Sequence, residues 1–159
     1  MNVRMARNVA LGAALVGSVL VNTAPAYAAG SCADREARQS LEVRVLQSEL
    51  MVAALTCGER QSYNAFVTTF KPFLKSQGAE LRAFFVEQFG LSAGPYRMNK
   101  MVTRLANAAS QNSVSVSTQE FCAQAKTRFE QVLHTNTQGL LKLARTNPTA
   151  ADHGFKTCV

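Results

Sequence analysis

The sequence predicts an all-α protein, a four-helix up-down bundle braced by two disulfides. Three observations predict it. Apolar residues recur every three or four positions along most of the chain, no alternating strand pattern of useful length is present, and the chain has four cysteines, an even number. The length of 159 residues, 47% of them hydrophobic, is enough for one domain with one core.

Residues 1–28 have the layout of a secretory signal peptide. Arg4 and Arg7 precede an apolar run of 13 residues, and the segment ends in a small-x-small motif at Ala28, after which we expect cleavage. The apolar run is shorter than the roughly 20 residues that a membrane-spanning helix needs. We therefore expect an exported protein, periplasmic or extracellular, whose mature chain is one helical domain over residues 29–159 without a transmembrane segment.

The first two helices are predicted over residues 34–57 and 59–89. The first has two apolar stripes at helical spacing, and its residues from Leu50 to Leu55 are apolar all round, so we expect them to be the most buried. In the second, Pro72 disfavours helical geometry at the residue before it. Either two short helices meet there at a true turn, or one helix is kinked. The nearly unbroken apolar phase favours the kinked helix.

The third and fourth helices follow a loop at Gly90–Gly94. Pro95 fits the first turn of the third helix, and Ser117 begins a capping box ahead of the fourth, which Asn147-Pro148 ends. The expected inward residues are Met98, Met101, Val102, Leu105, Ala108 and Ala109 in the third helix, and Phe121, Ala125, Phe129, Val132, Asn136, Leu140 and Leu143 in the fourth. We expect the short segment after the fourth helix to be fixed only by its cysteine.

The cysteines are Cys32, Cys57, Cys122 and Cys158, and in an exported chain they indicate two disulfides. Cys32 and Cys57 bracket one helix about 37 Å long, far beyond the roughly 7 Å that a disulfide tolerates, which excludes that pair. With four helices, the first and last run antiparallel, which favours Cys57–Cys122 and Cys32–Cys158. A true turn at Pro72 would instead favour Cys32–Cys122 and Cys57–Cys158. We predict the first pairing.

The charge of the chain is moderately basic. Without residues 1–28, 15 basic and ten acidic residues remain, a net charge of +5. Dense Lys/Arg clusters with interleaved aromatic residues are missing, so we expect no nucleic-acid partner. Residues 88–119 contain no acid, yet Arg97, Lys100 and Arg104 recur there at helical spacing. They form a candidate anion-binding face, for which the alternative is an ordinary solvated helix face.

No motif for catalysis, a cofactor or a metal stands out, so we expect none of the three. The histidines form no close pair, and the cysteines lack metal-ligand spacing. Glu59 and Glu80 are imaginable as a glycosidase acid pair, but any ten acids offer one. Glu130 and His134, four residues apart, fit a surface ion pair better than a proton-transfer pair.

The aromatic residues allow two interpretations. They line a cavity for a lipid or another apolar molecule, or they fill the core of a chain without tryptophan, which is the commoner use. The set comprises Phe66, Phe70, Phe73, Phe84, Phe85, Phe89, Met98 and Met101. The leading hypothesis is a non-enzymatic interaction or structural protein that contacts another protein or an anionic polymer or lipid of the envelope. The alternatives are a carrier of an apolar molecule and, third, a cell-wall-active enzyme.

Three segments carry a resemblance: residues 46–57, 63–66 and 103–107, which read LQSELMVAALTC, YNAF and TRLAN. With them the chain resembles a group of small exported helical proteins of Gram-negative bacteria, a family without an assigned function. The resemblance covers most of residues 41–130. It implies a periplasmic helical domain and carries no catalytic motif.

Overall fold

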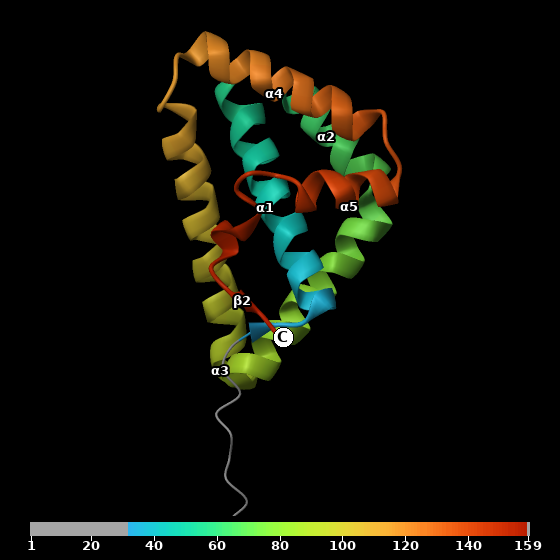
Figure 1. Ribbon diagram of the computed structural model, residues 1–159, viewed down its shortest axis with the longest axis vertical. Coiled ribbons are helices and arrows are strands. Elements are labelled where there is room, and N and C mark those ends of the chain that lie inside the picture. The colour runs from blue at the N-terminus through green and yellow to red at the C-terminus, as the bar shows by residue number, and fades with distance from the viewer. Residues whose placement is uncertain (1–31, 159) are drawn as a thin grey trace, which may run out of the picture.

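A computed structural model describes residues 32–158 as an all-α fold, so the predicted signal peptide lies outside the described residues. Five α-helices are joined by short links (Figure 1). They are α1 (Arg35–Thr56), α2 (Arg60–Thr69), α3 (Lys71–Ser113), α4 (Thr118–Leu133) and α5 (Thr137–Arg145), followed by the short 3-10 helix η1 (Ala150–His153). The strands β1 (Cys32–Ala33) and β2 (Lys156–Thr157) pair in parallel and bring together the two ends of the described segment.

Helix α1 is the central element, and every other helix contacts it. Asp34 begins it, since its carboxylate accepts a hydrogen bond from the Ala37 backbone N–H at 2.8 Å. Because α1 has two apolar stripes, other helices must cover it on two sides. The C-terminal half of α1 packs against α2, α4 and α5, and the N-terminal half packs against α3. The prediction for residues 50–55 is wrong at its last position, because Leu55 is exposed.

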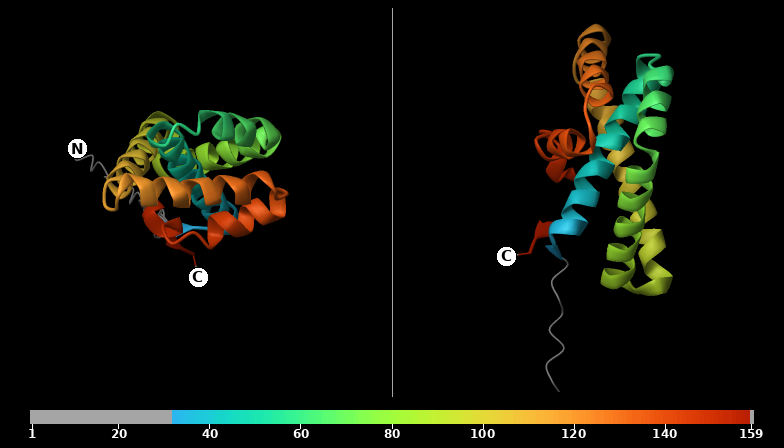
Figure 2. Two further views of the ribbon diagram at one scale, coloured as in Figure 1. Left: turned by 90° about the horizontal axis from the view of Figure 1, so that it is seen from above. Right: turned by 90° about the vertical axis from the view of Figure 1, so that its right-hand side faces the viewer.

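Between α2 and α3 the helical path is interrupted only at Phe70, whose φ and ψ are −99° and 14°. Pro72 lies in the first turn of α3. The backbone N–H groups of a first turn have no partner within the helix, so the N–H that proline lacks costs no helical hydrogen bond. Helix α2 and the first part of α3 therefore form one descending limb beside α1 (Figure 2). The structure has a bend at this proline and no chain reversal.

The chain reverses within α3, at Gly90, whose φ of 80° and ψ of 164° are not helical. Below, the first limb of α3 is residues 71–89 and the second limb is residues 91–113. The expected loop over Gly90–Gly94 is thus wrong, since the residues after Gly90 are already helical. Gly94 lets the limbs approach, because a Cβ atom there would lie 2.7 Å from the Phe85 carbonyl oxygen.

The expected fourth helix is two helices. Helix α4 ends at Leu133, and the side chain of Asn136 accepts a hydrogen bond from the Gly139 backbone N–H at 3.0 Å, which begins α5. Asn136 is therefore exposed, not inward. Helix α4 crosses the top of the molecule and α5 returns below it, so the four-helix up-down arrangement is not confirmed (Figure 1).

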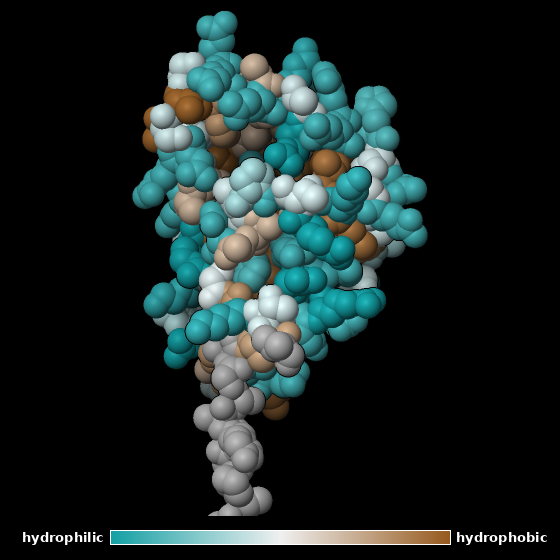
Figure 3. All heavy atoms as spheres, viewed as in Figure 1, coloured by the Kyte–Doolittle hydropathy of each residue, from teal (hydrophilic) through white to brown (hydrophobic). Residues whose placement is uncertain are grey.

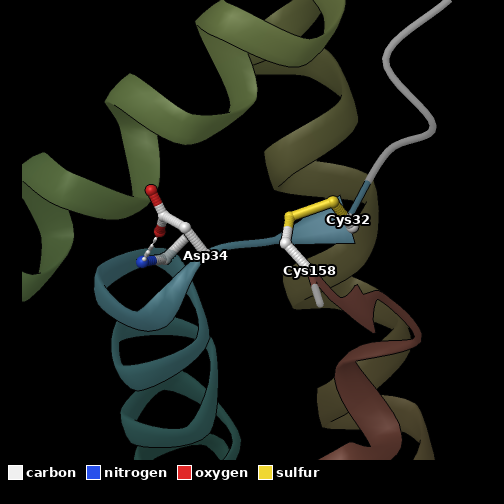
Figure 4. Close-up of a disulfide and its surroundings, with 4 residues drawn as sticks. Cys32, Asp34 and Cys158 are labelled. Carbon is white, nitrogen blue, oxygen red and sulfur yellow. Dashed lines mark hydrogen bonds between the residues drawn. A yellow bond between two sulfur atoms is a disulfide. The ribbon is translucent and has the colours of Figure 1, made fainter.

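Both predicted disulfides are confirmed. Cys57, at the end of α1, is bonded to Cys122 in the first turns of α4, with Cα atoms 5.4 Å apart. Cys32 is bonded to Cys158, with Cα atoms 5.0 Å apart, next to the Asp34 cap of α1 (Figure 4). Within residues 32–158, no helix is both long and apolar enough to cross a membrane.

Candidate anion-binding groove

An open groove with a volume of about 730 Å³ lies between the second limb of α3, the end of the first limb and the C-terminal segment. Its basic residues are the three that the sequence singled out, Arg97, Lys100 and Arg104. They share one side of the limb because three and four residues approximate one helical turn. The aromatic and apolar part of the lining comprises Phe85, Phe89, Tyr96, Met101 and Phe155. We call this site the basic groove.

The three cations are held differently. The Arg97 guanidinium lies over the Phe89 ring, 5.3 Å from its centroid. Arg104 donates from Nη2 to the His153 carbonyl oxygen at 2.6 Å, and Lys100 is exposed. Within the described part of the chain, none of the three forms an ion pair with a carboxylate. Their charge is therefore free to attract an anion.

Residues 146–158, called the tail below, contribute Phe155 to the remaining wall of the groove. Phe155 packs edge-on against Phe84 and Phe85, with ring centroids 5.0 and 5.4 Å apart. The His153 side chain is buried, and its Nδ1 accepts a hydrogen bond from the Phe155 backbone N–H at 3.1 Å. The expectation that the tail is fixed only by its cysteine is wrong, because aromatic packing and hydrogen bonds hold it along its length.

Burial lowers the pKa of His153 below its ordinary value, and the nearby guanidinium groups of Arg104 and Arg38 lower it further. Asp152 acts in the opposite direction on this pKa, with a smaller effect than burial or Arg104. A neutral imidazole is also what the Phe155 hydrogen bond requires, since Nδ1 accepts only when it carries no proton. The neutral imidazole of His153 therefore helps to hold the tail in place.

The beginning of the tail is attached to α1. The Glu49 carboxylate accepts hydrogen bonds from Asn147 Nδ2, at 2.6 Å, and from the Thr149 hydroxyl. A cavity of about 190 Å³ adjoins this contact and includes Phe121 and Arg128 in its lining. Both carboxylate oxygens of Glu49 already have partners, so we assign Glu49 to positioning of the tail.

The other candidate residues from the sequence do not form sites. Glu59 accepts a hydrogen bond from the Ser62 hydroxyl at 2.6 Å, whereas Glu80 is exposed on α3. About 30 Å of helix lies between these two glutamates along the chain, which is too far for a glycosidase pair. The ring Nδ1 of His134 lies 2.9 Å from the main-chain oxygen of Glu130, so the expected surface ion pair is replaced by a contact with the backbone.

The aromatic residues belong to two separate clusters. Phe66 and Phe70 are buried with the C-terminal half of α1, whereas Phe84 and Phe85 are buried with its N-terminal half. Most of the set therefore fills the core. Phe85, Phe89 and Met101 also border the basic groove. No group of three or more histidine, cysteine, aspartate or glutamate residues suited to a metal occurs between residues 32 and 158.

Sequence reasoning missed the parts of the groove that come from the tail. His153 and Phe155 reach the second limb of α3 across about 50 residues of chain, and no periodic pattern marks them. Their only signal in the sequence is that Phe155 is the one large apolar residue between Asn147 and Thr157. The sequence pattern places Gly94 in a loop and gives no sign of its close contact with Phe85, which depends on the turn at Gly90.

No protein-family model, curated protein or solved structure is significantly similar to this chain. The resemblance to exported proteins of Gram-negative bacteria therefore stays a prediction, and the function has to be argued from the groove itself.

Proposed function

We propose that this chain is an exported, non-enzymatic binding protein that contacts an anionic component of the bacterial envelope through the basic groove. The observation that carries the proposal is the convergence of Arg97, Lys100 and Arg104 on one groove without carboxylate partners among residues 32–158. Guanidinium and ammonium groups placed in this way suit phosphate or carboxylate groups, which they bind through charge-assisted hydrogen bonds.

The proposed location outside the cytosol is supported by two features. The sequence of residues 1–28 has the order of charge, apolar run and small-x-small motif that precedes cleavage. The two disulfides use all four cysteines, and such bonds persist in oxidising compartments. In the periplasm or outside the cell, phosphate-rich and carboxylate-rich polymers and lipid headgroups are the anions within reach.

The test is binding to an anionic polymer, for which polyphosphate is a suitable probe. Arg97→Gln combined with Lys100→Gln should weaken binding at least tenfold, since each cation at a charged surface contributes about 1 kcal/mol. Arg104 is kept because it also holds the tail. Binding of the wild-type protein should fall as salt is raised.

The matched control is Arg60→Gln combined with Lys126→Gln. Both residues are exposed and lie outside the groove lining, and the change in net charge is the same. Equal weakening by the two double variants would mean that only net charge matters, and the groove would no longer be the site. Isothermal titration calorimetry at two salt concentrations measures the difference.

A second candidate is a carrier of an amphiphilic molecule, favoured by the apolar residues that border the groove, Phe85, Phe89, Met101 and Phe155. A carrier should bind dodecyl phosphate, below its micelle concentration, far more tightly than inorganic phosphate. Native mass spectrometry of the protein isolated without reduction should then show an added mass that is lost on denaturation. Equal affinity for the two phosphates would leave only the anion-binding function.

A further inference from the structure

The turn of α3 presents apolar side chains to solvent at one end of the molecule. Leu91 is 84% exposed and Tyr96 is 68% exposed, and both adjoin the reversal at Gly90. We call residues 90–96 the turn segment. It lies at the lower end of the molecule, where the space-filling view also shows hydrophobic surface (Figures 1 and 3). Single exposed apolar side chains are common, so the weight of this observation lies in what stands beside Leu91 and Tyr96.

The exposure is built into the packing of the turn segment. Gly90 has a φ of 80°, which glycine adopts without strain, and this places Leu91 at the start of the second limb. Gly94 is buried against the Phe85 backbone, and Phe85 is itself almost fully buried. The contact between Gly94 and Phe85 therefore fixes the two limbs to each other next to the turn segment. The turn segment projects from this contact, and we also call it the tip.

The charge next to this tip is positive. Arg97 and Lys100 follow Tyr96 by one and four residues, and no acid occurs in residues 88–119. Glu87, exposed in the last turn of the first limb, is the nearest acid along the chain. The tip and the residues that follow it thus combine an aliphatic side chain, a tyrosine and two cations within about two and a half helical turns.

This combination matches the chemistry of a lipid surface. An aliphatic side chain enters the acyl region, tyrosine prefers the level of the headgroups, and cations pair with lipid phosphates. A protein partner would need a broad apolar face, with about 800 Å² buried on each side, whereas the tip offers two large apolar side chains. The two cations beside the tip favour a bilayer with anionic headgroups.

We propose that the turn segment docks this protein on an anionic membrane surface, with Leu91 and Tyr96 inserted among the lipids and Arg97 and Lys100 on their phosphates. The inference rests on the proposed function, because it names the anionic component that the basic groove faces. It adds Leu91, which lies outside the groove lining, whereas Tyr96 belongs to that lining.

The experiment measures sedimentation of the protein with vesicles of phosphatidylglycerol and phosphatidylcholine, and with vesicles of phosphatidylcholine alone. We expect binding to the anionic vesicles only, and Leu91→Ser combined with Tyr96→Ser should weaken it at least tenfold, because two apolar contacts are lost. Leu55→Ser is the control, since Leu55 is also exposed, at 61%, but lies in the last turn of α1, at the opposite end of the molecule. It should bind like the wild type.

Insertion is read directly from fluorescence. The chain contains no tryptophan, so Tyr96→Trp and, as control, Leu55→Trp each introduce a single reporter. With anionic vesicles, emission of the first should shift to shorter wavelength and be quenched by brominated lipids, while the second should not change. Vesicle binding without a shift at position 96, or undiminished by the double serine variant, would overturn the proposed docking.

The failure of the docking proposal is distinguishable from failure of the proposed function. Wild-type protein that binds polyphosphate in a groove-dependent manner but ignores anionic vesicles would contradict the membrane inference alone. Wild-type protein that binds neither probe would contradict both. Weaker vesicle binding with polyphosphate binding retained in the single variant Leu91→Ser, which leaves the groove lining intact, would support both. Circular dichroism of each variant confirms that it is folded.

Discussion

At the scale of single residues, His153 links the protonation state of the protein to the position of its tail. Its side chain is only 5% exposed, and its carbonyl oxygen accepts from Arg104 while its ring accepts from the Phe155 backbone. After burial, Arg104 lowers its pKa most, Asp152 raises it by less than Arg104 lowers it, and Arg38 lowers it by a still smaller amount. Protonation would place a new charge among guanidinium groups and remove the ring acceptor.

We therefore expect acid to destabilise the fold through His153. Because its folded pKa lies below the unfolded value of about 6.5, the unfolded chain binds the proton more readily. The stabilisation that neutral His153 gives the folded state is complete above about pH 6.5. It is lost as the pH falls through the pKa that His153 has in the folded state. Urea denaturation at several pH values from 7.5 to 5 should show the free energy of unfolding declining. His153→Asn keeps an acceptor without the titration, so the same decline in that variant would contradict the assignment.

At the scale of elements, the reversal inside α3 depends on glycines that play different roles. Gly90 supplies the positive φ, and Gly94 supplies the space in which the second limb passes the Phe85 carbonyl. Gly78, in the first limb, does neither, since a Cβ atom there would meet no atom within 4 Å. The three positions therefore predict different responses to the same substitution.

Gly94→Ala should lower the free energy of unfolding by about 1–3 kcal/mol. The added methyl group would collide with backbone atoms of Phe85, which cannot rotate away as a side chain can, so the two limbs must move apart. Gly78→Ala is the control, and it should raise the free energy by about 0.5–1 kcal/mol, since alanine favours a helix. Thermal and urea denaturation compare the variants. A Gly94→Ala protein as stable as the wild type would show that the limbs do not depend on this close approach.

The elements also show which sequence signals were sufficient. The apolar stripes predicted α1 because a helix that is buried on several sides needs them, and Met101, Leu105 and Ala109 are buried as expected. The break before α5 was missed because Asn136 falls in phase with the apolar stripe, while its side chain serves as a helix cap. Local chemistry at that residue outweighs the periodic pattern.

At the scale of the whole molecule, the separation in sequence between contacting residues decided which contacts could be predicted. The disulfides were predictable because the length of α1 excludes the pair Cys32–Cys57. The chain also keeps its direction through the bend at Phe70, as the preferred pairing requires. The cations of the groove were predictable because they lie on one helix. Phe155 and His153 were not, because their partners are set by where the tail packs, which no local pattern encodes.

The two disulfides also close very different parts of the molecule, which leads to the last prediction. Cys57–Cys122 closes a separation of 65 residues between α1 and α4, and Cys32–Cys158 closes 126 residues and ends the tail. By loop entropy alone, replacing the first pair with serine should lower the free energy of unfolding by about 4 kcal/mol, and replacing the second by about 5 kcal/mol.

The second value holds only if the tail stays in place without its bridge, and the structure gives reasons that it should. Phe155, Arg104 and Glu49 fix the tail at three separate points before Cys158 is reached. Urea denaturation of Cys32→Ser combined with Cys158→Ser, beside Cys57→Ser combined with Cys122→Ser, measures both losses. A loss much below that of the Cys57–Cys122 pair would mean that the tail detaches when the bridge is removed. The wall of the basic groove would then depend on the disulfide, and polyphosphate binding should weaken in the same variant.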